Sequence, residues 1–179
     1  MDGFAEDAFM RELSAQIAAA RRSLNALDEA IKYRNRNGIF DHAAHFLNHV
    51  AMVSKILKPG GAPNSRSRLR GRALRRQIGI EAHEPALDRR LRNLLEHVDE
   101  QIERWAEQGP NMWVDEVVGP LGKISVDILP EDNVLAIRWF DPKSKQIAIL
   151  GEKFSLTSIA SSLSVIESAV QRRLSELGY

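Results

Sequence analysis

The segment before residue 60 constrains the fold most strongly, because it holds two apolar patterns of helical length. Between about residue 4 and about residue 33, apolar side chains recur every three or four positions, which is the period of an amphipathic helix. The members of this stripe are Phe9, Leu13, Ile17, Ala20, Leu24, Leu27 and Ile31. The Asn-Arg-Asn-Gly sequence at residues 35–38 predicts a break. The next segment, about 39–57, is apolar on most sides, which is typical of a helix in the middle of a bundle.

Two more helices are expected after the Pro- and Gly-rich loop at residues 59–65. The first of them should run from about residue 65 to about residue 79. The second should begin at Pro85, which suits the first turn of a helix, and end near residues 109–110. Four helices joined by short loops predict a mainly α fold, with an antiparallel four-helix bundle over residues 1–110.

The last part of the chain has a different pattern. Residues 134–140 and 146–150 are β-type runs on either side of an Asp-Pro-Lys-Ser-Lys sequence, which predicts a β-hairpin. An apolar face between about residues 155 and 177 predicts a final amphipathic helix. A lone hairpin is only marginally stable, so we expect residues 111–179 to form a linker, the hairpin and a C-terminal helix packed on the bundle.

The composition excludes several classes of protein. With 44% hydrophobic and 27% charged residues, the chain is not wholly disordered. Because it contains no cysteine, it has no disulfides, no thiolate zinc site and no cysteine nucleophile. No apolar run is as long as a membrane span, and the acidic start of the chain lacks a secretory pattern. We therefore expect a cytoplasmic protein that does not associate with membranes.

The charge is concentrated at one place although the net charge is only +1. Six arginines fall between residues 66 and 76, and no acidic residue lies among them. They are Arg66, Arg68, Arg70, Arg72, Arg75 and Arg76. Guanidinium groups hold phosphate through paired hydrogen bonds, so this cluster predicts a surface that binds polyanions. A solvated helix face without a ligand is the alternative interpretation.

The fourth predicted helix carries the residues with the most specific spacing, Arg92, Asn93 and His97. At about 100° per residue, Asn93 and His97 lie about 40° apart on one helical face, whereas Arg92 and His97 lie about 140° apart. Arginine's long side chain or a second chain would have to complete such a site. The alternative is an ordinary ion pair between Arg92 and Glu96, with His97 at the edge of the core.

This pattern resembles the signature of the HEPN superfamily, in which an Arg is followed after four to six residues by a His, on the last helix of a four-helix bundle. In that family Asn, Asp or His commonly follows the Arg, as Asn93 follows Arg92 here. Residues 91–103, residues 51–59 and the tail after Ile137 also resemble uncharacterised bacterial HEPN-like proteins. The resemblance therefore covers nearly the whole chain.

The resemblance implies a metal-independent endoribonuclease that works as a homodimer without a cofactor. Arg92, Asn93 and His97 would be the catalytic residues, in a composite cleft formed by the motif helices of two chains. His97 would move a proton, Arg92 would hold the scissile phosphate, and Asn93 would orient it, with a 2′,3′-cyclic phosphate as product. Some members of the superfamily only bind RNA or proteins, so a non-catalytic RNA-binding or protein-interaction module is the alternative.

One position departs from a branch of that family. In toxin–antitoxin members with a nucleotidyltransferase partner, a Tyr often stands two residues after the motif His. Asp99 occupies this position here. Adenylylation by such a partner is therefore not expected.

A second group of histidines offers a weaker alternative. His42, His45 and His49 stand on the second predicted helix at intervals of three and four residues. Their span is about 10 Å along the axis, so at most two of them, such as His45 and His49, could share a metal ion. A polar stripe at the surface or at a contact is the simpler interpretation, and we expect no bound metal.

Overall fold

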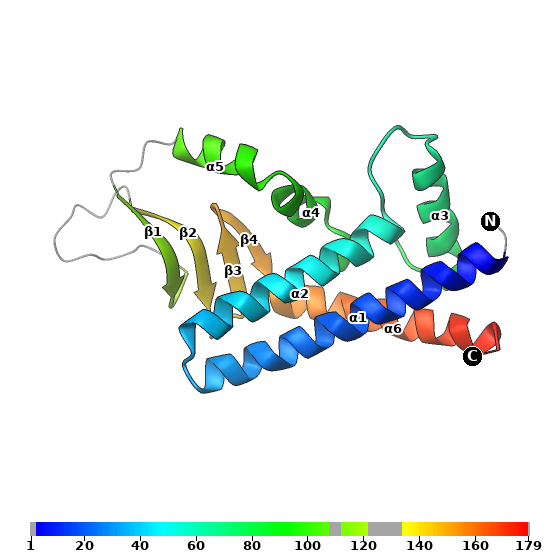
Figure 1. Ribbon diagram of the computed structural model, residues 1–179, viewed down its shortest axis with the longest axis horizontal. Coiled ribbons are helices and arrows are strands. Elements are labelled where there is room, and N and C mark those ends of the chain that lie inside the picture. The colour runs from blue at the N-terminus through cyan, green and yellow to red at the C-terminus, as the bar shows by residue number, and fades with distance from the viewer. Residues whose placement is uncertain (1–2, 108–111, 122–133, 179) are drawn as a thin grey trace.

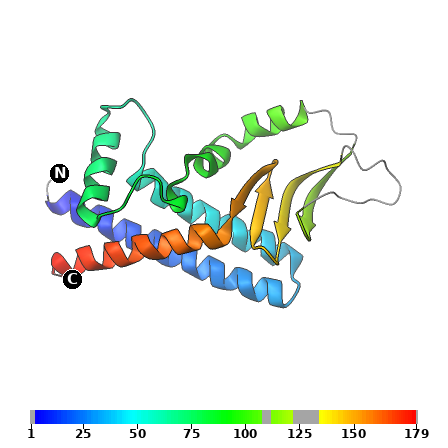
Figure 2. The same ribbon diagram turned by 180° about the vertical axis from the view of Figure 1, so that it is seen from behind.

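The computed structural model describes residues 3–107, 112–121 and 134–178. The chain is mainly helical, with a small mixed sheet and a long final helix (Figures 1 and 2). In chain order the elements are α1 (Gly3–Lys32), α2 (Arg36–Leu57), α3 (Arg66–Ile78), the 3₁₀ helix η1 (Pro85–Leu87), α4 (Arg89–Glu96), α5 (Val98–Ala106), β1 (Met112–Val118), β2 (Val134–Asp141), β3 (Gln146–Ile149), β4 (Glu152–Ser155) and α6 (Leu156–Glu176). Within the described ranges, no helix has the length and apolar character needed to cross a membrane.

The long helices α1, α2 and α6 build the core, and all three were predicted. α1 and α2 form a helical hairpin, and α6 lies along α1 (Figures 1 and 2). The Asn35 side chain caps α2 by accepting the N–H of Gly38, so the helix starts a few residues before the expected position. The fully buried side chains of this core include Leu13, Ile17, Leu27, Phe46, Leu47, Leu156 and Ile166.

α3 approaches the end of α2 more closely than most helices can. Gly71 makes this possible, because a Cβ at this position would lie 2.4 Å from Pro59 Cδ and 2.7 Å from the Leu57 carbonyl oxygen. The Ser65 side chain caps the start of α3, and Gly79 ends the helix in the left-handed conformation at φ +70°. The arginines of α3 are therefore held against the loop that follows α2.

The single helix expected from Pro85 to residues 109–110 is wrong. The chain forms η1, α4 and α5 instead, and the expected end lies outside the described residues. Asp88 starts a new helix by accepting the N–H of Arg90, and His97 leaves helical geometry at φ −130° and ψ 43°. On the two sides of the break, α4 contacts α2 and buries Leu91, and α5 buries Trp105 (Figure 1).

The sheet confirms the predicted hairpin and adds two strands. β2 and β3 pair antiparallel, as expected, and β4 pairs antiparallel with β3. β1 pairs parallel with β2, so the expected linker over residues 111–132 is wrong at residues 112–118. Residues 122–133 of that linker lie outside the described part of the chain. The sheet order is β1-β2-β3-β4, and α6 follows β4 directly.

The close approach of α3 to α2 gives a stability prediction. Gly71→Ala should lower the free energy of unfolding by about 1–3 kcal/mol, because the added methyl group has no room beside Pro59 and Leu57. At an open helical site the same substitution stabilises by roughly 0.5–1 kcal/mol, so the sign is diagnostic. Urea denaturation of both proteins measures the difference. A variant as stable as the wild type would contradict the close approach.

Candidate functional site

The three residues of the HEPN-like motif differ in their exposure to solvent. Arg92 is only 3% exposed, whereas Asn93 and His97 are at the surface. The Asn93 carbonyl accepts the backbone N–H of His97, which is the last helical bond of α4. His97 stands at the junction between α4 and α5 rather than within one continuous helix. Two of the three predicted catalytic side chains therefore face solvent, and the third is enclosed.

The guanidinium group of Arg92 is held by backbone and carboxylate. Its Nη1 donates a hydrogen bond to the Lys58 carbonyl oxygen at 2.9 Å. Its Nε lies 3.6 Å from Glu96 Oε2, and Glu96 also pairs with Lys55 Nζ at 3.0 Å. Burial lowers the pKa of Arg92, an effect that Glu96 opposes and Arg89 increases. The predicted ion pair between Arg92 and Glu96 thus forms at ion-pair distance, while Arg92 also ties α4 to the end of α2.

His97 presents an accessible imidazole beside a carboxylate. Its side chain is 54% exposed, and Nδ1 lies 3.5 Å from Glu100 Oε1 in the first turn of α5. Glu100 also accepts a hydrogen bond from Arg104 Nη2 at 3.3 Å, and the exposed imidazole is free to exchange a proton with another molecule. Glu100 was not among the predicted site residues, although its spacing of three residues from His97 was visible in the sequence.

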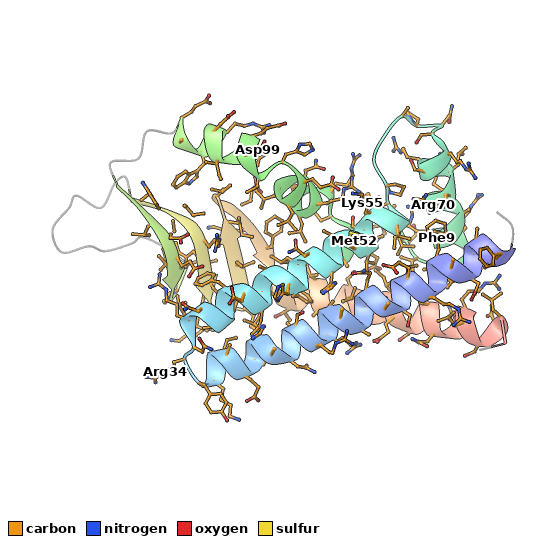
Figure 3. All side chains as sticks on the ribbon, viewed as in Figure 1. Phe9, Arg34, Met52, Lys55, Arg70 and Asp99 are labelled. Atoms are coloured by element: carbon orange, nitrogen blue, oxygen red, sulfur yellow. The ribbon has the colours of Figure 1, made fainter. Side chains whose placement is uncertain are left out.

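The six clustered arginines point in two directions. Arg66, Arg70 and Arg76 line a depression beside α1, where the Arg70 guanidinium stacks 4.6 Å from the centre of the Phe9 ring (Figure 3). The other three, Arg68, Arg72 and Arg75, line a pocket beside the α2 end. Arg72, Arg75 and Arg76 also line a third depression together with Glu81, so the two groups adjoin.

The pocket gathers cationic residues from three parts of the chain. Lys58 from the end of α2 and Arg89 from the start of α4 join Arg68, Arg72 and Arg75 of α3. A Cβ at Gly60 would lie 3.5 Å from Arg92 Nη2 and 3.6 Å from Arg89 Nη2, so the buried guanidinium of Arg92 lies beside this group. We call these five lining residues, Lys58, Arg68, Arg72, Arg75 and Arg89, the cationic pocket. Sequence reasoning missed Lys58 and Arg89, which are distant from the cluster in the chain.

The three histidines of α2 do not form a metal centre in the described structure. His49 Nδ1 lies 2.7 Å from Gln16 Oε1 on α1, and His45 is exposed. In residues 3–107, 112–121 and 134–178, no three His, Cys, Asp or Glu side chains are grouped closely enough to hold a metal ion. His49 contributes a contact between α1 and α2.

Comparisons of the chain with protein-family models, with curated proteins and with solved structures find no significant match. The functional argument therefore rests on the residues and their geometry. Its two parts are the exposed His97 with Glu100 and the cationic pocket, which lie at opposite ends of α4.

The enclosed position of Arg92 predicts that this residue stabilises the fold, whether or not it also takes part in catalysis. Arg92→Ala should lower the free energy of unfolding by about 1–3 kcal/mol, because the partly buried Lys58 carbonyl loses its partner. The matched control is Arg89→Ala, three residues earlier and exposed, which should change stability by no more than about 0.5 kcal/mol. Chemical denaturation of both variants checks this, and equal stabilities would contradict it.

The surroundings of His49 predict its titration. Burial lowers its pKa below the ordinary value, and the nearby His45 and Arg22 lower it further. A histidine with a lowered pKa in the folded state costs stability as the pH falls below about 6.5, where the unfolded chain takes up the proton more readily. In an NMR titration, His49 should titrate below the ordinary value of about 6.5, and His45→Gln should raise its pKa. An unchanged pKa in that variant would contradict the assignment.

Proposed function

We propose that the protein is an RNA-binding endoribonuclease of the HEPN type, which acts as a homodimer and needs no metal ion. The observation that carries the proposal is the exposed imidazole of His97 at one end of α4, while Arg89 of the cationic pocket lies at the other end. Arg89 is the first residue of α4, and His97 follows its last residue. The eight residues of the helix place these two positions about 12 Å apart along its axis. An RNA strand along α4 would meet cations at one end and a proton-transfer group at the other.

The chemistry needs no group that the chain lacks. A ribose 2′-oxygen attacks the adjacent phosphorus, the bond from phosphorus to the 5′-oxygen breaks, and a 2′,3′-cyclic phosphate forms. One group must take the proton from the 2′-OH, and another must give a proton to the leaving 5′-oxygen. A single chain offers one His97, so two copies of the α4–α5 junction would supply both groups. DNA should resist, because it lacks the attacking hydroxyl.

The proposal includes a finer fold assignment and assigned roles. In it, α1, α2, α3 and the segment from η1 to α5 correspond to the HEPN-like four-helix bundle of residues 1–110, and the sheet and α6, which shares the core with α1 and α2, pack on it. Asn93, exposed beside the junction, would orient the phosphate. We also propose that the protein is cytoplasmic and that the arginine cluster is its RNA-binding surface. Asp99 lies on α5, where the toxin–antitoxin branch has its Tyr (Figure 3), so the proposal includes no adenylylation.

The environment of Arg92 favours a second candidate, an RNA-binding module without catalysis. The Arg92 guanidinium is enclosed and donates to the Lys58 carbonyl, which is not the arrangement of a group that grips a substrate phosphate. In this candidate, the cationic pocket binds RNA and the His97 imidazole transfers no proton. In both candidates the protein binds RNA, but only in the first does it cleave the RNA.

Cleavage of mixed RNAs in the presence of EDTA tests the proposal. His97→Ala should lower the cleavage rate by about 10²–10⁴-fold, the usual contribution of general acid–base catalysis. The matched control is His45→Ala, an exposed histidine of α2 that does not line the cationic pocket, which should cleave like the wild type. We use His97 rather than Arg92 because Arg92→Ala also removes a structural hydrogen bond.

The products distinguish this reaction from others. Fragments should end in a 2′,3′-cyclic phosphate, and RNA with 2′-O-methyl groups should stay intact. Wild-type protein that binds RNA and leaves it uncut would support the non-catalytic candidate. Cleavage that persists in His97→Ala would contradict the assignment of this residue.

A further inference from the structure

The walls of the cationic pocket define the ligand that it would accept. The pocket has a volume of about 130 Å³, and its remaining lining residues are Pro59 and Ala82. Within the described part of the chain, five of its seven lining residues are cationic and none is acidic. Positive charges gathered around one pocket repel, so an anion in the pocket would relieve an unfavourable arrangement.

Hydrogen bonds within the protein hold these side chains without neutralising them. Arg68 Nη1 donates to the Gly61 carbonyl at 3.2 Å, and Arg72 Nη2 donates to the Pro63 carbonyl at 2.9 Å. Arg75 donates to the Leu57 carbonyl. A carbonyl oxygen fixes the direction of a guanidinium group but carries no net charge. Each arginine therefore keeps its charge and further N–H donors for a ligand.

Nearby acidic groups only partly offset the charge. Asp88 already pairs with Arg90 at 2.7 Å. Glu81 lies beside Ala82 and opposes the lowering of the Arg75 pKa, which burial and Arg72 cause. Burial lowers the pKa of Lys58, and Arg75, Arg89 and Arg92 also lower it, while Asp88 alone acts in the opposite direction. The surroundings of Lys58 are thus those of a cation that lacks sufficient counter-charge.

The size of the pocket restricts the ligand to a small anion. Its 130 Å³ is about ten times the space that one water molecule needs, about 10–15 Å³. It is well below the roughly 300–1,000 Å³ of sites that enclose drug-sized ligands. One phosphate group fits these limits, whereas a base and its sugar would remain outside. The pocket therefore accepts a single phosphate group and does not enclose a whole nucleotide.

We propose that the cationic pocket binds a phosphomonoester, and that in the RNA-binding protein proposed above it receives the terminal phosphate of the strand. A phosphomonoester carries about 1.5–2 negative charges at neutral pH, more than the single charge of an internal phosphodiester. Five converging cations favour the more highly charged group. The identity of the strand rests on the proposed function, whereas the phosphate chemistry rests on the pocket alone.

Fluorescence anisotropy with matched oligonucleotides tests this inference. Labelled 2′-O-methyl RNAs, which cannot be cut by 2′-oxygen attack, carry a 5′-phosphate, a 3′-phosphate or hydroxyls at both ends. At least one phosphorylated form should bind about tenfold more tightly, the contribution of one charge-assisted hydrogen bond. Arg89→Gln should remove this preference. Arg89 is exposed, so its replacement should leave the fold intact, which circular dichroism checks.

Arg76→Gln is the matched control, because it removes the same charge from α3 outside the pocket. It should weaken binding of all the oligonucleotides by a similar factor and keep the preference for a terminal phosphate. Inorganic phosphate, the other source of this chemistry, should raise the melting temperature of the wild type and of Arg76→Gln but not of Arg89→Gln.

The outcomes separate the two proposals. RNA binding that is indifferent to a terminal phosphate would overturn the pocket assignment and leave RNA binding intact. A preference that survives in Arg89→Gln would also overturn it. Thermal stabilisation by phosphate that depends on Arg89, without any RNA binding, would support the pocket and contradict the proposed function.

Discussion

The structure depends on arginine side chains that donate to backbone carbonyls at the end of α2. The last carbonyls of a helix have no partner within the helix, and the loop that follows adds more of them. Four guanidinium groups from α3 and α4 supply the missing donors. The pairs are Arg75 with Leu57, Arg92 with Lys58, Arg68 with Gly61, and Arg72 with Pro63. These bonds fix α3 and α4 on the helical hairpin, and the absence of a side chain at Gly71 lets α3 come close enough to make them.

The same contacts concentrate positive charge at one place. Because carbonyl oxygens accept hydrogen bonds without cancelling charge, the residues that hold the loop also create the cationic pocket. Structure and binding therefore share side chains here, and a loss of RNA binding in an α3 variant has two possible physical origins. Arg89 and His97 avoid this overlap, since both are exposed at the ends of α4.

Elements with a local, one-sided apolar pattern could be predicted from the sequence. α1, α2, α3, α6 and the β2–β3 hairpin follow from periodicity and from the residues at their ends. β1 could not, because it pairs parallel with β2 across a long separation in the chain. The break at His97 could not either, since no Gly or Pro marks it. The sequence placed Arg92 beside Glu96 but gave no sign that its guanidinium is buried against the α2 end.

NMR mapping of an uncleavable RNA onto the protein tests the central claim most directly, namely that one face made of the cationic pocket and the α4–α5 junction binds RNA. The account predicts that adding a 2′-O-methyl oligonucleotide shifts the Nε–Hε signals of Arg68, Arg72, Arg75 and Arg89 together with the imidazole signals of His97. Signals of His45, exposed on α2 about 20 Å along the helix from Lys58, should stay unchanged. Shifts confined to residues away from α3 and α4, or no shifts at RNA concentrations well above those of the protein, would contradict it.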